Sequence, residues 1–124
     1  IHGLWPDNEN NVLNNCKPKS YKDIRDLPIQ NKIYDRWPDL KRAKWLCMKD
    51  QEFWRHEFNK HGSCSMDRYD QKAYFDLAIN LKDKFDLLTT LRKHRIYPGF
   101  AYTVKEIGDA IKTVTTVYPN MKCT

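Results

Sequence analysis

The residues best suited to chemistry lie in one twelve-residue run, FWRHEFNKHGSC, at positions 53–64. Two histidines, a glutamate and a lysine fall close together in it. If the run is helical, residues at spacing i, i+3, i+4, i+7 and i+8 share one face, which is normally apolar and buried. Here that face carries Phe53, His56, Glu57, Lys60 and His61. Such a face is a poor core, and it predicts the lining of a cleft.

These residue types favour general acid–base chemistry on a phosphodiester. The reaction needs a base for the attacking hydroxyl, an acid for the leaving oxygen and positive groups around phosphorus. Histidine, with an ordinary pKa of about 6.5, can take either proton role near neutrality. Attack by a ribose 2′-hydroxyl needs no metal and would confine the activity to RNA. Trp5 and Phe53 offer flat faces for base stacking, worth about 1–3 kcal/mol per base.

Metal binding and nucleophilic catalysis fit the same run less well. The zinc motif H-E-x-x-H needs two histidines four residues apart on one face. His56 and His61 are five apart, about 140° around a helix, and Lys60 would repel a metal ion. Ser63 is in no G-x-S-x-G elbow, and Cys64 has the character of a disulfide partner. We therefore expect no metal and no other cofactor.

Composition narrows the class of protein. The 124 residues fit at most one domain, residues 1–124, and carry a formal net charge of +6. A basic chain suits a polyanionic partner such as nucleic acid. It has no apolar stretch of about eighteen residues, so we expect no membrane span. The chain opens abruptly, without methionine, on Ile1 and the segment His2-Gly3-Leu4-Trp5-Pro6, which suggests a fragment of a longer protein.

Helices are the elements that the periodicity predicts. Asp50 is a candidate N-cap for the histidine helix, with Glu52 in its first turn and Gly62 at its C-cap. Trp54 and Phe58, four apart on another face, can pack in the core. Further helices are expected at residues 29–37, at 70–94 as one helix or two with a slight break, and at 103–118, where Thr103 and Glu106 form a capping box and Pro119 ends the helix.

Four cysteines, at positions 16, 47, 64 and 123, allow three complete pairings. None forms a C-x-x-C pair of the kind expected at most zinc or redox sites. Their wide separation in a small basic domain fits structural disulfides and an oxidising compartment, although buried free thiols stay an alternative.

Two segments together resemble the active-site segments of the ribonuclease T2 family: residues 2–6 and residues 53–64. The runs at 35–40, 74–78 and 81–88 are similar to plant S-RNases of self-incompatibility, particularly the nightshade type. The resemblance covers nearly the whole chain. It implies an α+β fold, with helices on a central antiparallel sheet, in a fragment that lacks the N- and C-terminal parts.

The resemblance also implies roles for the candidate residues. His61 would be the general base and His2 the general acid, although a lone His2 would more often be structural. His56 would bind phosphate, and Glu57 and Lys60 would stabilise the transition state. Two base sites would be lined by Trp5 with Asp7 and by Phe53. The implied disulfide is Cys16–Cys64, while Cys123 would pair beyond Thr124 and Cys47 would be free or paired upstream of Ile1.

The expected protein is thus a secreted, extracellular, monomeric endoribonuclease that forms 2′,3′-cyclic phosphates with little base-sequence specificity. Its partners would be RNA and, as a pistil self-incompatibility determinant, a pollen-side protein that contacts residues 17–44. Two alternatives remain: an S-like defence or phosphate-scavenging ribonuclease, and a catalytically inactive RNA-binding module on the same fold. A zinc hydrolase would be sensitive to chelators, which we do not expect.

Overall fold

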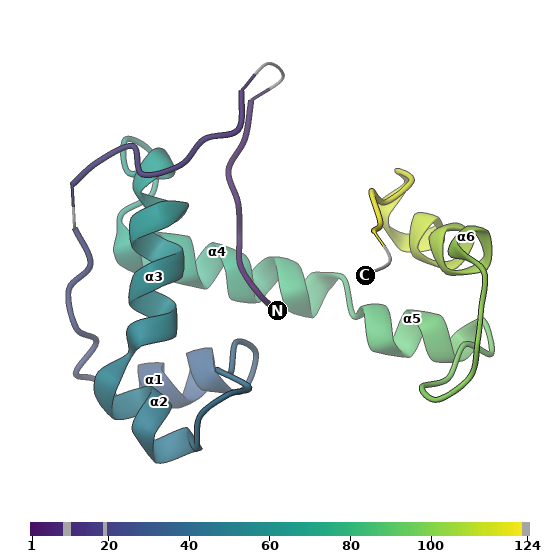
Figure 1. Cartoon of the computed structure of the whole chain (residues 1–124), viewed down its shortest axis with the longest axis horizontal. Coiled ribbons are helices and arrows are strands. Elements are labelled where there is room, and N and C mark those ends of the chain that lie inside the picture. Colours follow the sequence, from purple (N-terminus) through teal and green to yellow (C-terminus); the bar gives the residue numbers. More distant parts are fainter. Residues whose placement is uncertain (9–10, 19, 123–124) are drawn as a thin grey trace. The chain divides into compact units, whose positions relative to one another are not determined.

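The computed structural model describes residues 1–8, 11–18 and 20–122. The chain forms two compact units, residues 1–82 and residues 83–124. The elements of unit 1, coloured purple to green in Figure 1, are α1 (Leu27–Tyr34), α2 (Lys44–Asp50), α3 (Glu52–Lys60), the short 3₁₀ helix η1 (Gly62–Ser65) and most of α4 (Gln71–Lys84). Unit 2 contains α5 (Leu87–Lys93) and α6 (Val104–Thr115).

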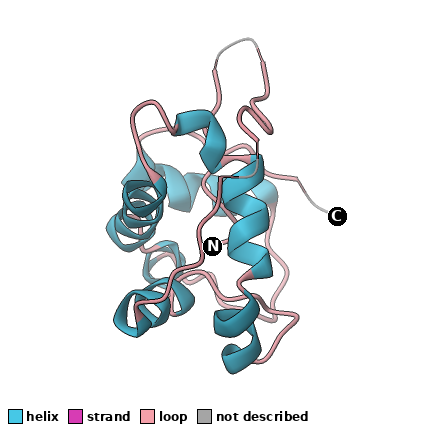
Figure 2. Ribbon diagram, turned by 90° about the vertical axis from the view of Figure 1, so that its left-hand side faces the viewer, coloured by secondary structure: helices cyan, strands magenta, loops and turns pink. Residues whose placement is uncertain are grey.

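Helices and loops account for all of the described chain, and no strand occurs among these residues (Figure 2). The helical part of the expected α+β fold is therefore present. The antiparallel sheet on which the helices were expected to pack stays a prediction. None of the described helices has both the length and the apolar character needed to cross a membrane.

The expected helices at 29–37 and 70–94 both form, with shifted boundaries. The first, α1, begins earlier because Asp26 caps it by accepting a hydrogen bond from the backbone N–H of Ile29, and it ends earlier, with Asp35 as its C-cap. The second is two helices, α4 and α5, with a new N-cap at Asp86 whose side chain accepts from the N–H of Thr89. Of the two alternatives for residues 70–94, one helix or two with a slight break, the structure therefore has two helices.

The start of the histidine helix differs from the prediction. Asp50 is the last residue of α2, and Gln51 separates α2 from α3 in a left-handed backbone conformation, with φ of 52°. Gln51 is buried, and its side-chain amide donates to the backbone carbonyl of Ile24 and accepts from the backbone N–H of the same residue. The amide oxygen also accepts from the Tyr21 hydroxyl. A buried residue thus turns the chain from one helix into the next, which local capping rules do not anticipate. Glu52 does lie in the first turn, as expected.

Gly62 was predicted to lie at the C-cap of the same helix, and this was wrong. His61 is the C-cap, and Gly62 begins η1. The glycine is needed for space, since a Cβ at Gly62 would lie 2.5 Å from a ring carbon of Phe58. Gly62 therefore lets η1 pack closely on α3.

The core of unit 1 is aromatic. Trp54 and Phe58 are both fully buried, which confirms their predicted packing role. They lie among residues from α1, α2, α4 and the turn after α1, and the cluster consists of Ile33, Trp37, Cys47, Met48, Trp54, Phe58, Tyr74, Phe75, Ala78 and Ile79. The face of α3 opposite this core is left for polar residues.

Unit 2 is a pair of helices, α5 and α6. The expected capping box is present at the start of α6: the Thr103 hydroxyl accepts from the backbone N–H of Glu106, whose carboxylate accepts from the N–H of Thr103. The helix ends at Thr115, with Thr116 in a left-handed conformation, before Pro119 is reached.

Candidate active site

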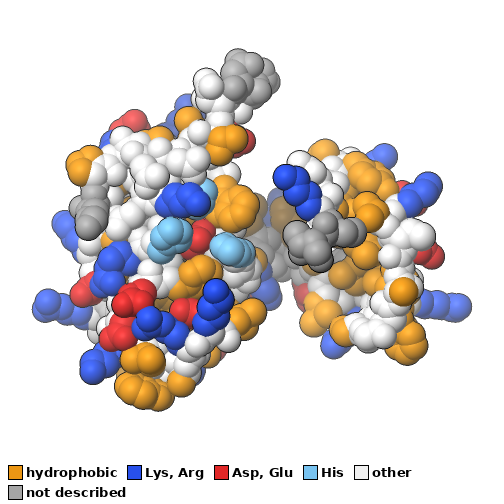
Figure 3. Space-filling view, in the orientation of Figure 1, with side chains coloured by type: hydrophobic (Ala, Val, Ile, Leu, Met, Phe, Trp, Pro, Cys, Tyr) orange, Lys and Arg blue, Asp and Glu red, His pale blue; other side chains and the backbone are white. Residues whose placement is uncertain are grey.

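Three predicted site residues meet at one buried carboxylate. Glu57, on α3, is only 2 % exposed, and its Oε1 lies 3.3 Å from Nε2 of His2. Its other oxygen, Oε2, accepts a hydrogen bond of 2.9 Å from the indole N–H of Trp5. The N-terminal segment therefore brings an imidazole and an indole to the histidine helix across more than fifty residues of sequence. Figure 3 shows histidine side chains gathered on one face of unit 1, with acidic, basic and hydrophobic side chains beside them.

His61 joins this cluster by stacking on Trp5. The two rings are nearly parallel, with centroids 5.0 Å apart and planes at 28°. The imidazole is buried, and its Nδ1 has no hydrogen-bond partner among the described residues. Any proton exchange with a substrate would therefore use Nε2.

Burial is the main cause of a lowered pKa at His61. The Glu57 carboxylate opposes this effect, while Lys60, His56 and His2 add to it. The balance favours the neutral imidazole, which is the form that a general base requires. His56 and Lys60 are thus close enough to His61 to act on it electrostatically.

The N-terminal segment is held in place by its backbone. The indole N–H of Trp37 donates to the carbonyl of His2 at 2.6 Å, and the hydroxyl of Tyr74 donates to the carbonyl of Leu4 at 2.7 Å. Both donors are fully buried core residues. The core therefore fixes the backbone of His2, while the imidazole itself stays largely exposed.

Phe53 lies beside the cluster formed by His2, Trp5, Glu57 and His61. Its ring meets that of His2 edge-on at 5.6 Å, and both line a cavity of about 620 Å³ together with residues 38–41. The Trp5 ring, in contrast, is 56 % exposed although its indole N–H is bonded. The rings of Trp5 and Phe53 thus both contact the His2 imidazole edge-on.

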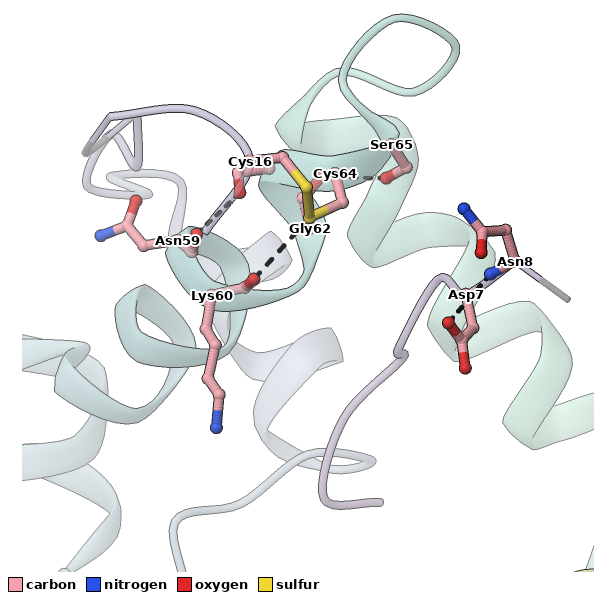
Figure 4. Close-up of a disulfide and its surroundings, with 9 residues drawn as sticks. Asp7, Asn8, Cys16, Asn59, Lys60, Gly62, Cys64 and Ser65 are labelled. Atoms are coloured by element: carbon pink, nitrogen blue, oxygen red, sulfur yellow. Dashed lines mark hydrogen bonds between the residues drawn. A yellow bond between two sulfur atoms is a disulfide. The ribbon is translucent and has the colours of Figure 1, made fainter. Parts of the chain in front are cut away.

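Among the described residues, no hydrogen bond or ion pair joins the Glu57 carboxylate to His56, Lys60 or Asp7. His56 is exposed and Lys60 half-buried, on the turns of α3 that flank Glu57. The Asp7 carboxylate accepts from the N–H of Asn8, and in Figure 4 it lies well away from Lys60. The structure therefore gathers His2, Trp5 and Phe53 with the histidine helix, but it does not bring Asp7 into that cluster.

A disulfide joins Cys16 to Cys64, the pairing that the resemblance implied, with Cα atoms 4.9 Å apart (Figure 4). Beside it, the N–H of Asn15 donates to the carbonyl of Lys60 at 2.7 Å. Closing a loop of this length is worth roughly 4 kcal/mol in the chain-entropy model. The bridge ties the loop after the His2 segment to the end of α3.

The other two cysteines were left open by the sequence. Cys47 is a buried free thiol, and burial raises its pKa. Cys123 lies outside the described residues. Within the part of the chain that is described, no group of three or more histidine, cysteine, aspartate or glutamate side chains is placed to hold a metal ion.

Known proteins match both the sequence and this geometry. The model of the Ribonuclease T2 family matches residues 1–124. The chain belongs to the Ribonuclease T2 family. Among curated relatives, Ribonuclease S-6 of Nicotiana alata is 56 % identical and Ribonuclease S-7 of the same plant 52 % identical, in both cases over 100 % of this chain and 58 % of the relative. The chain thus spans little more than half the length of these relatives.

Solved structures agree. The gametophytic self-incompatibility associated SF11-RNase of Nicotiana alata matches with a TM-score of 0.92 and 48 % identity, over 100 % of this chain and 63 % of that one. Ribonuclease MC1 from bitter gourd seeds matches with a TM-score of 0.78 and 32 % identity, over 91 % of this chain and 57 % of that one. The helices and loops described above are therefore arranged as in part of a T2 ribonuclease.

Sequence reasoning missed two residues that build this T2-type site. Gly3 lies so close to the cluster that an added Cβ would be 2.3 Å from both Glu57 Oε2 and Trp5 Nε1. Its position between His2 and Trp5 was a signal of close approach that could have been used. Trp37 was not among the predicted site residues, and no feature of its local sequence indicates that it binds the backbone of His2.

Proposed function

We propose that the protein carrying this chain is an endoribonuclease that cleaves single-stranded RNA by 2′,3′-transphosphorylation, without a metal ion and with little base-sequence specificity. The observation that supports this most directly is that two histidines far apart in the sequence are joined through Glu57 and Trp5. His2 pairs with the buried Glu57, and His61 stacks on Trp5, which bonds the same carboxylate. Family membership adds independent support.

In the proposed mechanism, Nε2 of His61 removes the proton of the ribose 2′-hydroxyl. The 2′-oxygen attacks phosphorus, and the bond from phosphorus to the 5′-oxygen breaks. His2, as the imidazolium, gives its proton to that leaving oxygen. The products are a 2′,3′-cyclic phosphate and a free 5′-hydroxyl, and both histidines have exchanged their protonation states.

The remaining site residues would bind the phosphate and the bases. Lys60 and His56 place positive charge beside the phosphate, which stabilises the charge on its oxygens in the transition state. Glu57 supports this by fixing His2 and Trp5. Phe53 and Trp5 would receive the two bases that flank the scissile bond, by stacking rather than by hydrogen bonds, so little sequence preference is expected.

The products distinguish this proposal from a metal-dependent hydrolase. The intact ribonuclease incubated with a dinucleoside monophosphate is expected to release a 2′,3′-cyclic phosphate first, with the same rate in the presence of a strong chelator. Chromatography against authentic cyclic, 2′- and 3′-phosphates identifies the product. Cleavage of DNA at a similar rate, direct formation of a 5′-phosphate, or loss of activity with chelator would contradict the mechanism.

For the biological role, we propose a secreted pistil determinant of self-incompatibility. Support comes from identities of 47–56 % to Nicotiana S-ribonucleases, compared with 34 % to Ribonuclease MC of Momordica charantia. The S-like alternative shares the chemistry, and it would be favoured by expression in stressed leaves rather than only in the pistil.

Residues 17–44 are the part of unit 1 proposed to contact a pollen-side partner. The segment includes α1 and its flanking loops, and two of its large apolar side chains, Leu27 and Leu40, are exposed. Exchanging the exposed residues of 17–44 between two alleles, with Trp37 and the other buried residues kept, is expected to change which pollen is rejected while RNA cleavage is retained. An exchange that leaves pollen rejection unchanged would rule this surface out.

A further inference from the structure

Another hollow is lined by side chains of α3, and it shares only Glu52 with the cavity beside His2 and Phe53. It has a volume of about 330 Å³. Its lining consists of Asn15, Glu52, Arg55, His56, Asn59 and Lys60. Because His56 and Lys60 also flank the catalytic cluster on α3, this hollow adjoins the proposed site of the scissile phosphate.

Lys60 is the cation in the lining of the hollow that can bind a ligand, because the other strongly charged side chains there are paired. Arg55 is occupied: it donates to the Asp23 carboxylate at 2.6 Å and to the carbonyl of Asp50 at 3.0 Å. Glu52 is neutralised by an ion pair with Arg42. No carboxylate among the described residues pairs with the Lys60 ammonium. The hollow therefore favours an anion.

Two amide side chains complete the lining. The Asn59 side chain is fixed, because its Oδ1 accepts from the backbone N–H groups of Ser20 and Tyr21, each at 3.0 Å. Its Nδ2 has no partner among the described residues and is free to donate. Asn15 has φ of 52° and is held by the bond from its N–H to the Lys60 carbonyl, beside the Cys16–Cys64 disulfide. Its side-chain amide also lacks a partner within the described part of the chain.

We propose that this hollow is a subsite for the nucleotide next to the scissile bond, in which Asn15 and Asn59 bind the neighbouring phosphate and its ribose, beside the Lys60 ammonium that also serves the scissile phosphate. Neutral amide donors combined with one unpaired ammonium match a single phosphodiester, because they supply directed hydrogen bonds with a net positive charge. The inference rests on the proposed ribonuclease function. Dinucleoside monophosphates would not reach this subsite, whereas trinucleotides would.

The test compares two substrates with two matched variants of the intact ribonuclease. Asn15→Gly removes the amide and keeps a residue that accepts the left-handed backbone, and Asn14→Gly makes the same change at the neighbouring exposed position outside the hollow. The measured quantity is kcat/KM for a trinucleotide, extended on the 5′ or on the 3′ side, divided by kcat/KM for the dinucleoside monophosphate.

For the wild type, a trinucleotide extended on one of the two sides is expected to have a kcat/KM about tenfold higher than that of the dinucleoside monophosphate. This is the rate difference that corresponds to one hydrogen bond to a charged group. Asn15→Gly should lower the raised ratio by about five- to tenfold, whereas Asn14→Gly should leave it within twofold. Asn15→Asp, which repels phosphate and also tolerates the backbone, should lower the ratio further.

Each outcome decides between the two proposals. Equal ratios in wild type and Asn15→Gly, with the dinucleoside monophosphate still cleaved, would overturn the subsite and leave the ribonuclease function standing. An equal fall in Asn14→Gly would also overturn it, by assigning the effect to the loop backbone. Failure of the wild type to cleave either substrate would instead contradict the ribonuclease function itself.

Discussion

Replacing His61 with alanine is expected to lower kcat/KM for RNA by about 10²–10⁴-fold, the usual loss when a general acid–base group is removed. The proposed base is the imidazole Nε2, and no other described histidine stacks on Trp5. The measurement is initial-rate cleavage of a dinucleoside monophosphate by the intact ribonuclease. Circular dichroism and urea unfolding establish that the variant is folded.

The pH profile gives this prediction a second readout. Because burial lowers the pKa of His61, the neutral base persists below its ordinary value of about 6.5. The acid limb of kcat/KM in the wild type should therefore fall below about pH 6.5 and should be absent in the alanine variant. The free energy of unfolding has a matching pH dependence, because His61 takes up a proton in the unfolded chain at pH values where it stays neutral in the folded chain. The contribution of His61 to stability is thus present above about pH 6.5 and declines as pH falls towards the lowered pKa.

The matched control is His94→Ala. His94 follows α5 in unit 2 and is outside the cluster at Glu57. The His94→Ala variant should cleave RNA with a kcat/KM within twofold of that of the wild type. A His61→Ala variant that is folded and cleaves RNA normally would contradict the acid–base mechanism. If the wild type binds RNA but cleaves none, the alternative of an inactive RNA-binding module would be supported instead.

Replacing Gly3 with alanine is expected to lower kcat/KM by about 10²-fold with the helices intact. The added Cβ would lie 2.3 Å from Glu57 Oε2 and 2.3 Å from Trp5 Nε1, the two atoms that form the hydrogen bond between these residues. Glu57 is buried, so either the Trp5 side chain or the backbone of the N-terminal segment must shift. A displacement of about 1 Å at reacting groups can cost about 10²-fold in rate, and His2 is the adjacent residue.

Trp5→Phe separates loss of the hydrogen bond from displacement of the segment. It removes the indole donor and leaves a Glu57 oxygen without that partner, but it adds no atom near Gly3. Its cost should be about 1–3 kcal/mol in stability or in transition-state binding. Helical content and urea midpoint are measured beside activity for both variants. A Gly3→Ala enzyme within twofold of wild type would show that this close approach does not position the acid.

The sequence by itself determined the local features of the site. The spacing of His56, Glu57, Lys60 and His61 predicted a polar helical face, and Trp54 and Phe58 predicted the core side of the same helix. Both are periodic signals that reside within a few turns. The capping box at Thr103 is equally local, since two side chains three residues apart satisfy each other's backbone groups.

Tertiary structure alone decided how the two halves of the site meet. No local pattern indicates that Trp37 and Tyr74 bind the carbonyls of the N-terminal segment, because these contacts join residues 35 and 70 positions apart. Long-range packing also places Gln51, rather than Asp50, at the start of α3. The predicted face became a candidate active site only when the core held His2 and Trp5 against Glu57, where a buried carboxylate needs partners for both of its oxygens.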